Sequence, residues 1–175
     1  ELADLGIAEL VEAGGVALDI NSQSASETYQ RLSRLSPDKN ISNKVLVETF
    51  VPKGVETLVG ITSSSLGKVL TIGVGGILTE VISDVAVRLL PVDSKIVNEM
   101  IDETRLAILF SGVRGAAASN RDAFVDTVLR ITDAVIDWPS GCELDINPLT
   151  VLPDGAWVLD SAYSPAAKSS ERSTH

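Results

Sequence analysis

Apolar and polar residues alternate near the carboxyl terminus of the chain, a pattern typical of β-strands with one buried face. The segment CELDINPLTVL, residues 142–152, is followed by a Pro-Asp-Gly turn and then by AWVLDSAY, residues 156–163. This order predicts a strand, a hairpin turn and a returning strand. Because successive side chains of a strand point to opposite faces, Glu143, Asp145 and Asn147 are expected to share one polar face.

The middle of the chain changes from strand-like to helix-like patterns. Between residues 45 and 72, apolar runs are separated by PKG at 52–54 and by SSSLG at 63–67. These separators are typical hairpin loops, so the region is predicted to be an antiparallel meander. Apolar residues then recur at three- and four-residue spacing over 94–109 and 121–137, which predicts two helices.

The amino-terminal segment predicts one strand and one helix. VALDI, residues 16–20, has the β-branched and apolar content of a buried strand. Ser24 and Glu27 have the spacing of a capping box, which predicts a helix that ends near Pro37. The combination of hairpins with helix pairs indicates an α+β architecture rather than a doubly wound parallel sheet.

Composition narrows the class of protein. At 175 residues and 45% hydrophobic, the chain can bury a core of ordinary size. Its formal net charge of -10 and its scattered Lys and Arg residues argue against a nucleic-acid partner. No apolar run reaches the roughly 18 to 20 residues of a membrane span, so no membrane partner is expected. Cys142 is the single cysteine, which favours a reducing compartment and predicts a cytoplasmic protein.

The polar face of the closing hairpin is the main candidate for metal chemistry. The returning strand brings Asp160 to a position where it can lie across from Asn147. Oxygen-bearing side chains are expensive to bury in apolar strands unless a cation compensates them, and Mg²⁺ takes such ligands together with phosphates and waters. The alternative is that these residues simply face solvent, and periodicity alone does not separate the two.

Two motifs resemble a known family. ELDINPLTV (143–151) and VLDSAY (158–163) resemble the segments that close the ATP-grasp domain of ADP-forming acyl-CoA synthetases, relatives of the succinyl-CoA synthetase beta chain. GVGGILTEVISDVAVRLLP (73–91) is similar to that family's GxGGxxxExxxDxxxRxxP run. The resemblance implies an α+β ATP-grasp domain over 1–163, mostly its carboxyl-terminal lobe, with a flexible tail over 164–175. The rest of the amino-terminal lobe, including its ATP-binding lysine, is expected before the first residue.

The resemblance also implies candidate site residues. In the family, the Asn and the Asp of the two closing segments hold Mg²⁺ on the nucleotide phosphates, a role that falls here on Asn147 and Asp160. VLVETFVPKGVE, residues 45–56, resembles the strand that leads into the adenine pocket. The nucleotide-binding residues that follow from these likenesses are Glu48, Val51, Glu56, Gly75 and Gly76. Residues expected to support the site from a greater distance are Glu143, Arg88 and Arg114.

The residues alone leave plainer interpretations open. Without the family, Glu48 and Glu56 are exposed strand residues, and the GxGG run is a tight bend. Arg88 has Asp84, four residues earlier, as an alternative partner. His175 lies in the terminal tail and is not expected to be catalytic.

The reaction that the resemblance implies joins a carboxylic acid to CoA, with ATP converted to ADP and phosphate through an acyl phosphate and a phosphohistidine. The cofactors are then Mg²⁺ and ATP/ADP, and the partner is a CoA-binding domain or subunit that carries the phosphohistidine. We expect an acid–thiol ligase that is oligomeric and inactive as this isolated piece; the acyl substrate stays open.

Two departures from the family support a different function, a non-catalytic ATP-grasp-like module for nucleotide sensing or partner docking. TSSSLGK at 62–68 stands where the family has DPxFGP, and ELADLG at 1–6 lacks the family's His-Lys pair.

Overall fold

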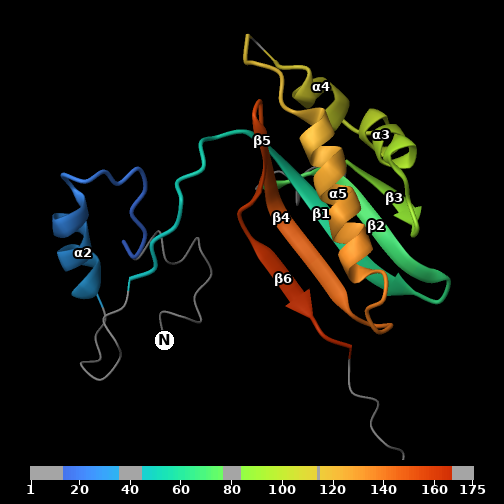
Figure 1. Ribbon diagram of the computed structural model, residues 1–175, viewed down its shortest axis with the longest axis horizontal. Helices are drawn as coiled ribbons and strands as arrows, with labels where there is room; N and C mark the ends of the chain where they lie inside the picture. Colours follow the sequence, from blue (N-terminus) through green and yellow to red (C-terminus); the bar gives the residue numbers. More distant parts are fainter. Residues whose placement is uncertain (1–13, 36–44, 77–83, 114, 167–175) are drawn as a thin grey trace, which may run out of the picture. The chain divides into compact units, whose positions relative to one another are not determined.

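The chain folds as two units, Glu1–Val51 and Pro52–His175. In this computed structural model, shown in Figure 1, the described residues are 14–35, 45–76, 84–113 and 115–166. No helix in these ranges is both long enough and apolar enough to cross a membrane.

The first unit contains helix α2, Ala25–Ser33, as the sequence predicts. Ser24 precedes the helix, but its hydroxyl bonds to Asn21 instead of a helix N–H, so the expected capping box is absent at this end. The predicted strand at 16–20 is wrong, because these residues have no strand structure. Asp19 has a φ of 53°, a left-handed conformation that interrupts an extended run.

In the described residues, the second unit contains a six-stranded antiparallel sheet. Its strands are β1 Val55–Ser64, β2 Gly67–Val74, β3 Val85–Leu89, β4 Glu143–Leu152, β5 Gly155–Val158 and β6 Ser161–Ser164. The spatial order is β3-β2-β1-β4-β5, and β6 also pairs with β4. The closing strand, turn and returning strand therefore form as predicted, with the returning strand divided into β5 and β6.

The predicted meander is only partly correct. β1 and β2 form a hairpin whose turn contains Ser65 and Leu66, within the predicted loop at 63–67. Residues 45–54, in contrast, form no strand, so the stretch at 52–54 is not a hairpin turn. An apolar run is strand-like only where a neighbouring strand satisfies its backbone groups, and sequence alone does not show that partner.

Helices α3 Ser94–Asp102, α4 Leu106–Phe110 and α5 Arg121–Val135 lie together on one face of the sheet (Figure 1). The predicted helix at 94–109 is divided between α3 and α4. Thr104 causes the break in part, because its hydroxyl accepts a hydrogen bond from the Leu106 N–H and replaces a helical backbone acceptor.

Side chains under the helices form the core. Thr57, Val59 and Ile61 alternate along β1 and are buried against the helices, and Phe124 of α5 packs against the Phe110 ring with a centroid distance of 5.4 Å. The intervening residues point to the opposite side of the sheet, which we call the open face. By strand register, the open face carries Glu56, Leu58, Thr71, Val87 and Asp145.

Candidate functional site

The candidate site centres on β4, where Asn147 and Asp160 are neighbours on adjacent strands. The Asn147 N–H donates to the Asp160 carbonyl oxygen at 3.2 Å, and the Leu159 N–H donates to the Pro148 carbonyl oxygen at 3.0 Å. These bonds continue the pairing between the ends of β5 and β6. The predicted position of Asp160 across from Asn147 is therefore confirmed, and Cβ atoms of such pairs are about 4.5–5.5 Å apart.

A β-bulge sets the direction of the Asn147 side chain. Between the pairs Thr57–Leu149 and Val59–Ile146, β4 has one more residue than β1. Asn147 lies in this extra step, while Ile146 and Leu149 on either side of it are both buried in the core. The strict alternation expected from the sequence therefore ends at Ile146. Bulges re-aim side chains in this way and often occur beside active sites.

The turn after β2 is bonded to β1 and to β4. The Gly76 N–H donates to Oδ1 of Asn147 at 2.8 Å, and the Gly75 N–H donates to the carbonyl oxygen of Glu56 at 3.0 Å. The structure thus brings together Glu56, Gly75, Gly76 and Asn147, which the sequence placed far apart. Gly73 and Val74 of the GxGG run end strand β2, and contact of the run with phosphate remains a prediction.

A side chain at either glycine of the turn would be strained. Gly76 has a φ of 70°, which favours glycine, and a Cβ there would meet only the flexible end of the Glu56 side chain. A Cβ on Gly75 would collide with the backbone of Thr57. Glycine therefore allows a positive φ at Gly76 and a close approach to β1 at Gly75, and keeps side chains out of this part of the site.

Asp145 is an acidic residue close to Asp160. The sequence pattern predicts it on the polar face of the strand but does not include it among the site residues. Burial raises the pKa of the Asp145 carboxyl above its usual value, and the negative charge of Asp160 raises it further. The two carboxylates are thus near enough to repel each other. The signal in the sequence was the two-residue spacing between Asp145 and Asn147, which puts them on the same side of a strand.

These donors suit Mg²⁺. The atoms of Asp145, Asn147 and Asp160 that can bind a metal are all oxygens. The described residues contain no group of three or more His, Cys, Asp or Glu side chains that could hold a metal by themselves. A partial oxygen shell fits Mg²⁺, which usually keeps waters and phosphate oxygens as its other ligands. Zinc needs nitrogen or sulfur donors. Cys142 is buried, and its Sγ contacts the Tyr163 hydroxyl at 3.4 Å.

Glu143 and Arg88, which were expected to support the site, lie on different parts of the sheet. Glu143 is exposed at the start of β4, opposite Ser164 of β6. Arg88 pairs in register with Leu70, a core residue, so it lies on the helix side of the sheet. Its guanidinium binds the carboxylate of Glu103, and the alternative pairing with Asp84 is wrong.

Asp84 instead accepts a hydrogen bond from the Arg105 N–H at 2.7 Å. The predicted pairing assumed helical spacing between positions 84 and 88, but position 88 lies in a strand. Arg88 and Asp84 both connect β3 to the region around α3 and α4.

Three predicted residues lie outside the part of the structure in which the cluster is described. Glu48 is exposed and Val51 is half-buried in the first unit, whose segment 45–51 has no regular secondary structure. Their proposed adenine contacts remain predictions. Arg114 lies outside the described residues, as do residues 77–83 of the glycine-rich motif and the terminal His175.

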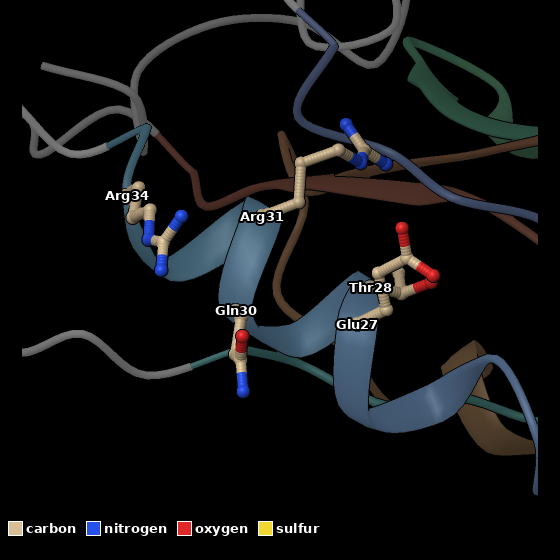
Figure 2. Close-up of a pocket in the computed structure, with 5 residues that line it drawn as sticks. All are labelled: Glu27, Thr28, Gln30, Arg31 and Arg34. Carbon is tan, nitrogen blue, oxygen red and sulfur yellow. The ribbon is translucent and has the colours of Figure 1, made fainter.

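A separate hollow lies along α2. Figure 2 shows the residues that line it, Glu27, Thr28, Gln30, Arg31 and Arg34. Four of them lie on this helix and Arg34 follows its last residue, and all but Thr28 are exposed. Arg31 is already engaged, because it donates to the Gly14 carbonyl oxygen at 2.8 Å. None of the predicted site residues lines this hollow, so we assign it no binding role.

Comparison with known proteins identifies one domain family and several similar ligases. The ATP-grasp domain family matches residues 5–163. The beta subunit of ADP-forming acetate–CoA ligase I from Pyrococcus furiosus is 30% identical over 156 residues, which cover 86% of this chain and 67% of that subunit. ADP-forming acetate–CoA ligase I from Archaeoglobus fulgidus is 30% identical over 154 residues, which cover 85% of this chain but only 22% of that ligase.

A solved structure gives the same result. The dinucleotide-forming acetyl-coenzyme A synthetase 1 of Candidatus Korarchaeum cryptofilum, in complex with coenzyme A and Mg-AMPPCP, superposes with a TM-score of 0.74 at 25% identity. The match covers 88% of this chain and 69% of that chain, and in the complex a phosphohistidine segment points towards the nucleotide-binding site. The predicted α+β fold and the resemblance found in the sequence are confirmed, and the chain belongs to the ATP-grasp domain family.

Proposed function

We propose that this chain forms the nucleotide- and Mg²⁺-binding part of an ADP-forming acyl-CoA synthetase, an acid–thiol ligase. The observation that carries the proposal is the meeting of Asn147, Asp160 and the Gly75–Gly76 turn at one place on β4. Oxygen donors for a divalent cation thereby lie beside a stretch of backbone without side chains, which phosphate oxygens of a nucleotide can approach.

Each residue has a distinct task in this proposal. Asn147 and Asp160 hold the cation, and Asp145 adds a third oxygen-bearing side chain beside them. The glycine turn lets phosphate oxygens approach the backbone without a side chain between. Bound Mg²⁺ supplies charge neutralisation on the phosphate oxygens during phosphoryl transfer. Glu48, Val51 and Glu56 are proposed to contact the adenine and ribose through hydrogen bonds.

Other parts of the enzyme complete the reaction. The chain spans about two thirds of a beta subunit and about a fifth of a longer ligase, so the relatives contain further regions. We propose that a CoA-binding domain or subunit carries the phosphohistidine, since the Korarchaeum structure holds both coenzyme A and such a segment. Oligomeric assembly and a cytoplasmic location belong to the same proposal.

The sensor alternative is weakened by where the altered loop lies. Residues 62–68 span the end of β1, the turn and the start of β2, whereas Gly75 lies near the other end of that hairpin. Seven residues along a strand separate the pairs Thr57–Val74 and Ser64–Gly67, or roughly 24 Å. Lys68 also has a structural task there, because its Nζ donates to the Ile136 and Trp138 carbonyl oxygens at 2.9 and 2.7 Å. This departure from the family therefore does not alter the cluster around Asn147.

Calorimetry with Mg²⁺-ADP tests the proposal, combined with an assay for ADP release that depends on CoA and a carboxylic acid in the presence of the CoA-binding partner. We expect binding and turnover. Binding without turnover would favour the sensor, and no binding would remove both functions. Asp133→Asn, at an exposed position on α5, is the matched control for a lost carboxylate and should bind as the wild type does.

A further inference from the structure

We propose that the Gly76 main-chain N–H is a positioning group for the cation site, because it fixes which end of the Asn147 carboxamide faces the metal. This inference rests on the function proposed above and adds a residue to it. The hydrogen bond of 2.8 Å from Gly76 N–H to Asn147 Oδ1 is its basis.

An asparagine ligand has an orientation problem that an aspartate does not. Its carboxamide has an oxygen, which binds cations, and an NH₂ group, which repels them, and the two ends have nearly the same shape. A donor that binds the oxygen holds one of the two orientations. The oxygen has two lone pairs, so accepting from Gly76 leaves one for a cation. Partners of this kind, which hold a metal ligand without touching the metal, commonly change metal affinity by roughly 10- to 100-fold.

The donor itself is firmly anchored. The preceding N–H, of Gly75, donates to the Glu56 carbonyl oxygen, which ties the turn to β1. The Glu56 carboxylate fills the space where a Gly76 side chain would project. Asn147 is half-buried in its bulge, so its acceptor is also held in place. Both partners of the bond are thus fixed by the fold before any ligand binds.

The Gly76 amide can be observed selectively. Of the 13 glycines, only Gly15 and Gly76 directly follow another glycine. Protein labelled with glycine that carries ¹³C at the carbonyl and ¹⁵N at the amide therefore gives two signals in a carbonyl-to-amide correlation spectrum. The signal that disappears in Gly76→Ala identifies Gly76, and Gly15 serves as an internal reference.

The experiment compares amide hydrogen exchange at Gly76 in the wild type, Asn147→Ala, Asn147→Asp and Asn120→Ala. Asn120 is the matched control, because its Oδ1 accepts from the Ala123 N–H at the start of α5. Gly76 should exchange roughly three- to tenfold faster in Asn147→Ala, the effect of losing one hydrogen bond. Asn147→Asp and Asn120→Ala should leave it as slow as in the wild type. Unfolding midpoints measured in parallel show whether each variant is folded.

Titration with Mg²⁺-ADP then tests the role towards the cation. The inference predicts that the wild-type Gly76 resonance shifts while its exchange stays slow, because Oδ1 serves both partners. Faster exchange at Gly76 on binding would show that the cation displaces the hydrogen bond and would overturn the inference alone. Equal exchange in the wild type and Asn147→Ala would also overturn it. A wild type that gives no binding at all would overturn the proposed function and, with it, this role of Gly76.

Discussion

The two faces of the central sheet differ in what they contribute. On the helix side, Val59, Ile72 and Leu149 are fully buried and form the core with α3, α4 and α5. On the open face, Asp145 keeps its carboxylate beside that of Asp160, although burial and the charge of Asp160 raise the pKa of the Asp145 carboxyl. The helix side therefore carries the apolar side chains of the core. The open face carries neighbouring carboxylates, which the packing of the core does not explain. The comparison separates residues that hold the fold from residues that are proposed to hold a ligand.

The largest change in stability is expected from Phe124→Ala, on the helix side of the sheet. Phe124 is fully buried, and truncation leaves a cavity against the Phe110 ring. The free energy of unfolding should fall by about 3–5 kcal/mol, measured by urea denaturation. Under conditions where the variant is folded, its affinity for Mg²⁺-ADP should match the wild type. A selective loss of affinity in folded protein would contradict the separation of the two faces.

Gly76→Ala should lower the stability of the fold. The new Cβ sits on a backbone of positive φ, so we expect a loss of about 1–3 kcal/mol in unfolding free energy, measured by urea denaturation. The Glu56 carboxylate also lies where this Cβ projects, but it is the end of a flexible side chain and can turn away. Adding Glu56→Ala should therefore recover little of the lost stability. Full recovery in the double variant would show that the collision, and not the backbone conformation, limits this position.

Asn147→Ala and Asp160→Ala should weaken Mg²⁺-ADP binding by about tenfold or more while the fold is kept. Neither residue belongs to the apolar core, so urea midpoints should change little. Calorimetry on the two variants beside Asp133→Asn measures the difference. Affinity equal to the wild type in both variants would remove the metal assignment.

The smallest effect is a pH dependence from Asp145. Its pKa is raised in the folded protein, so the fold binds this proton more tightly than the unfolded chain does. The contribution of Asp145 to stability is therefore fully present below its usual pKa of 3.8 and is lost as the pH rises through the raised value. Asp145→Asn should then gain stability at pH 7 relative to the wild type, within about 0.5 kcal/mol because the group is largely exposed.

Thermal unfolding from pH 3 to pH 7 checks this prediction. The gain of Asp145→Asn should disappear at pH 3, where both side chains are neutral. A gain that is the same at both pH values would show that ionisation of Asp145 is not its cause.

Sequence alone predicts the parts of the site that depend on local pattern. The alternation in ELDINP and the Pro-Asp-Gly turn are enough to place Asp160 across from Asn147, because hairpin pairing follows from turn position. The helices near 94–109 and 121–137 follow from apolar spacing, apart from the break at Thr104.

The remaining features depend on contacts between distant segments. The bond from Gly76 to Asn147 Oδ1 joins residues that are 71 positions apart, and the bulge arises where β4 pairs with the distant strand β1, so no local pattern encodes either feature. The apolar run at 45–51 looks like a strand, yet forms none, because strand structure requires a hydrogen-bonding neighbour. The link between Arg88 and Glu103 was missed for a related reason, since helical spacing was assumed where a strand forms.

The most direct test of the central claim uses Mn²⁺ as a spectroscopic substitute for Mg²⁺. Free and bound Mn²⁺ are distinguished by electron paramagnetic resonance during a titration of the protein in the presence of ADP. The account predicts one bound Mn²⁺ per chain in the wild type, with binding lost in the Asn147→Ala, Asp160→Ala double variant. Unchanged Mn²⁺ binding in that double variant, with the fold intact, would contradict the claim that β4 and its returning strand hold the cation.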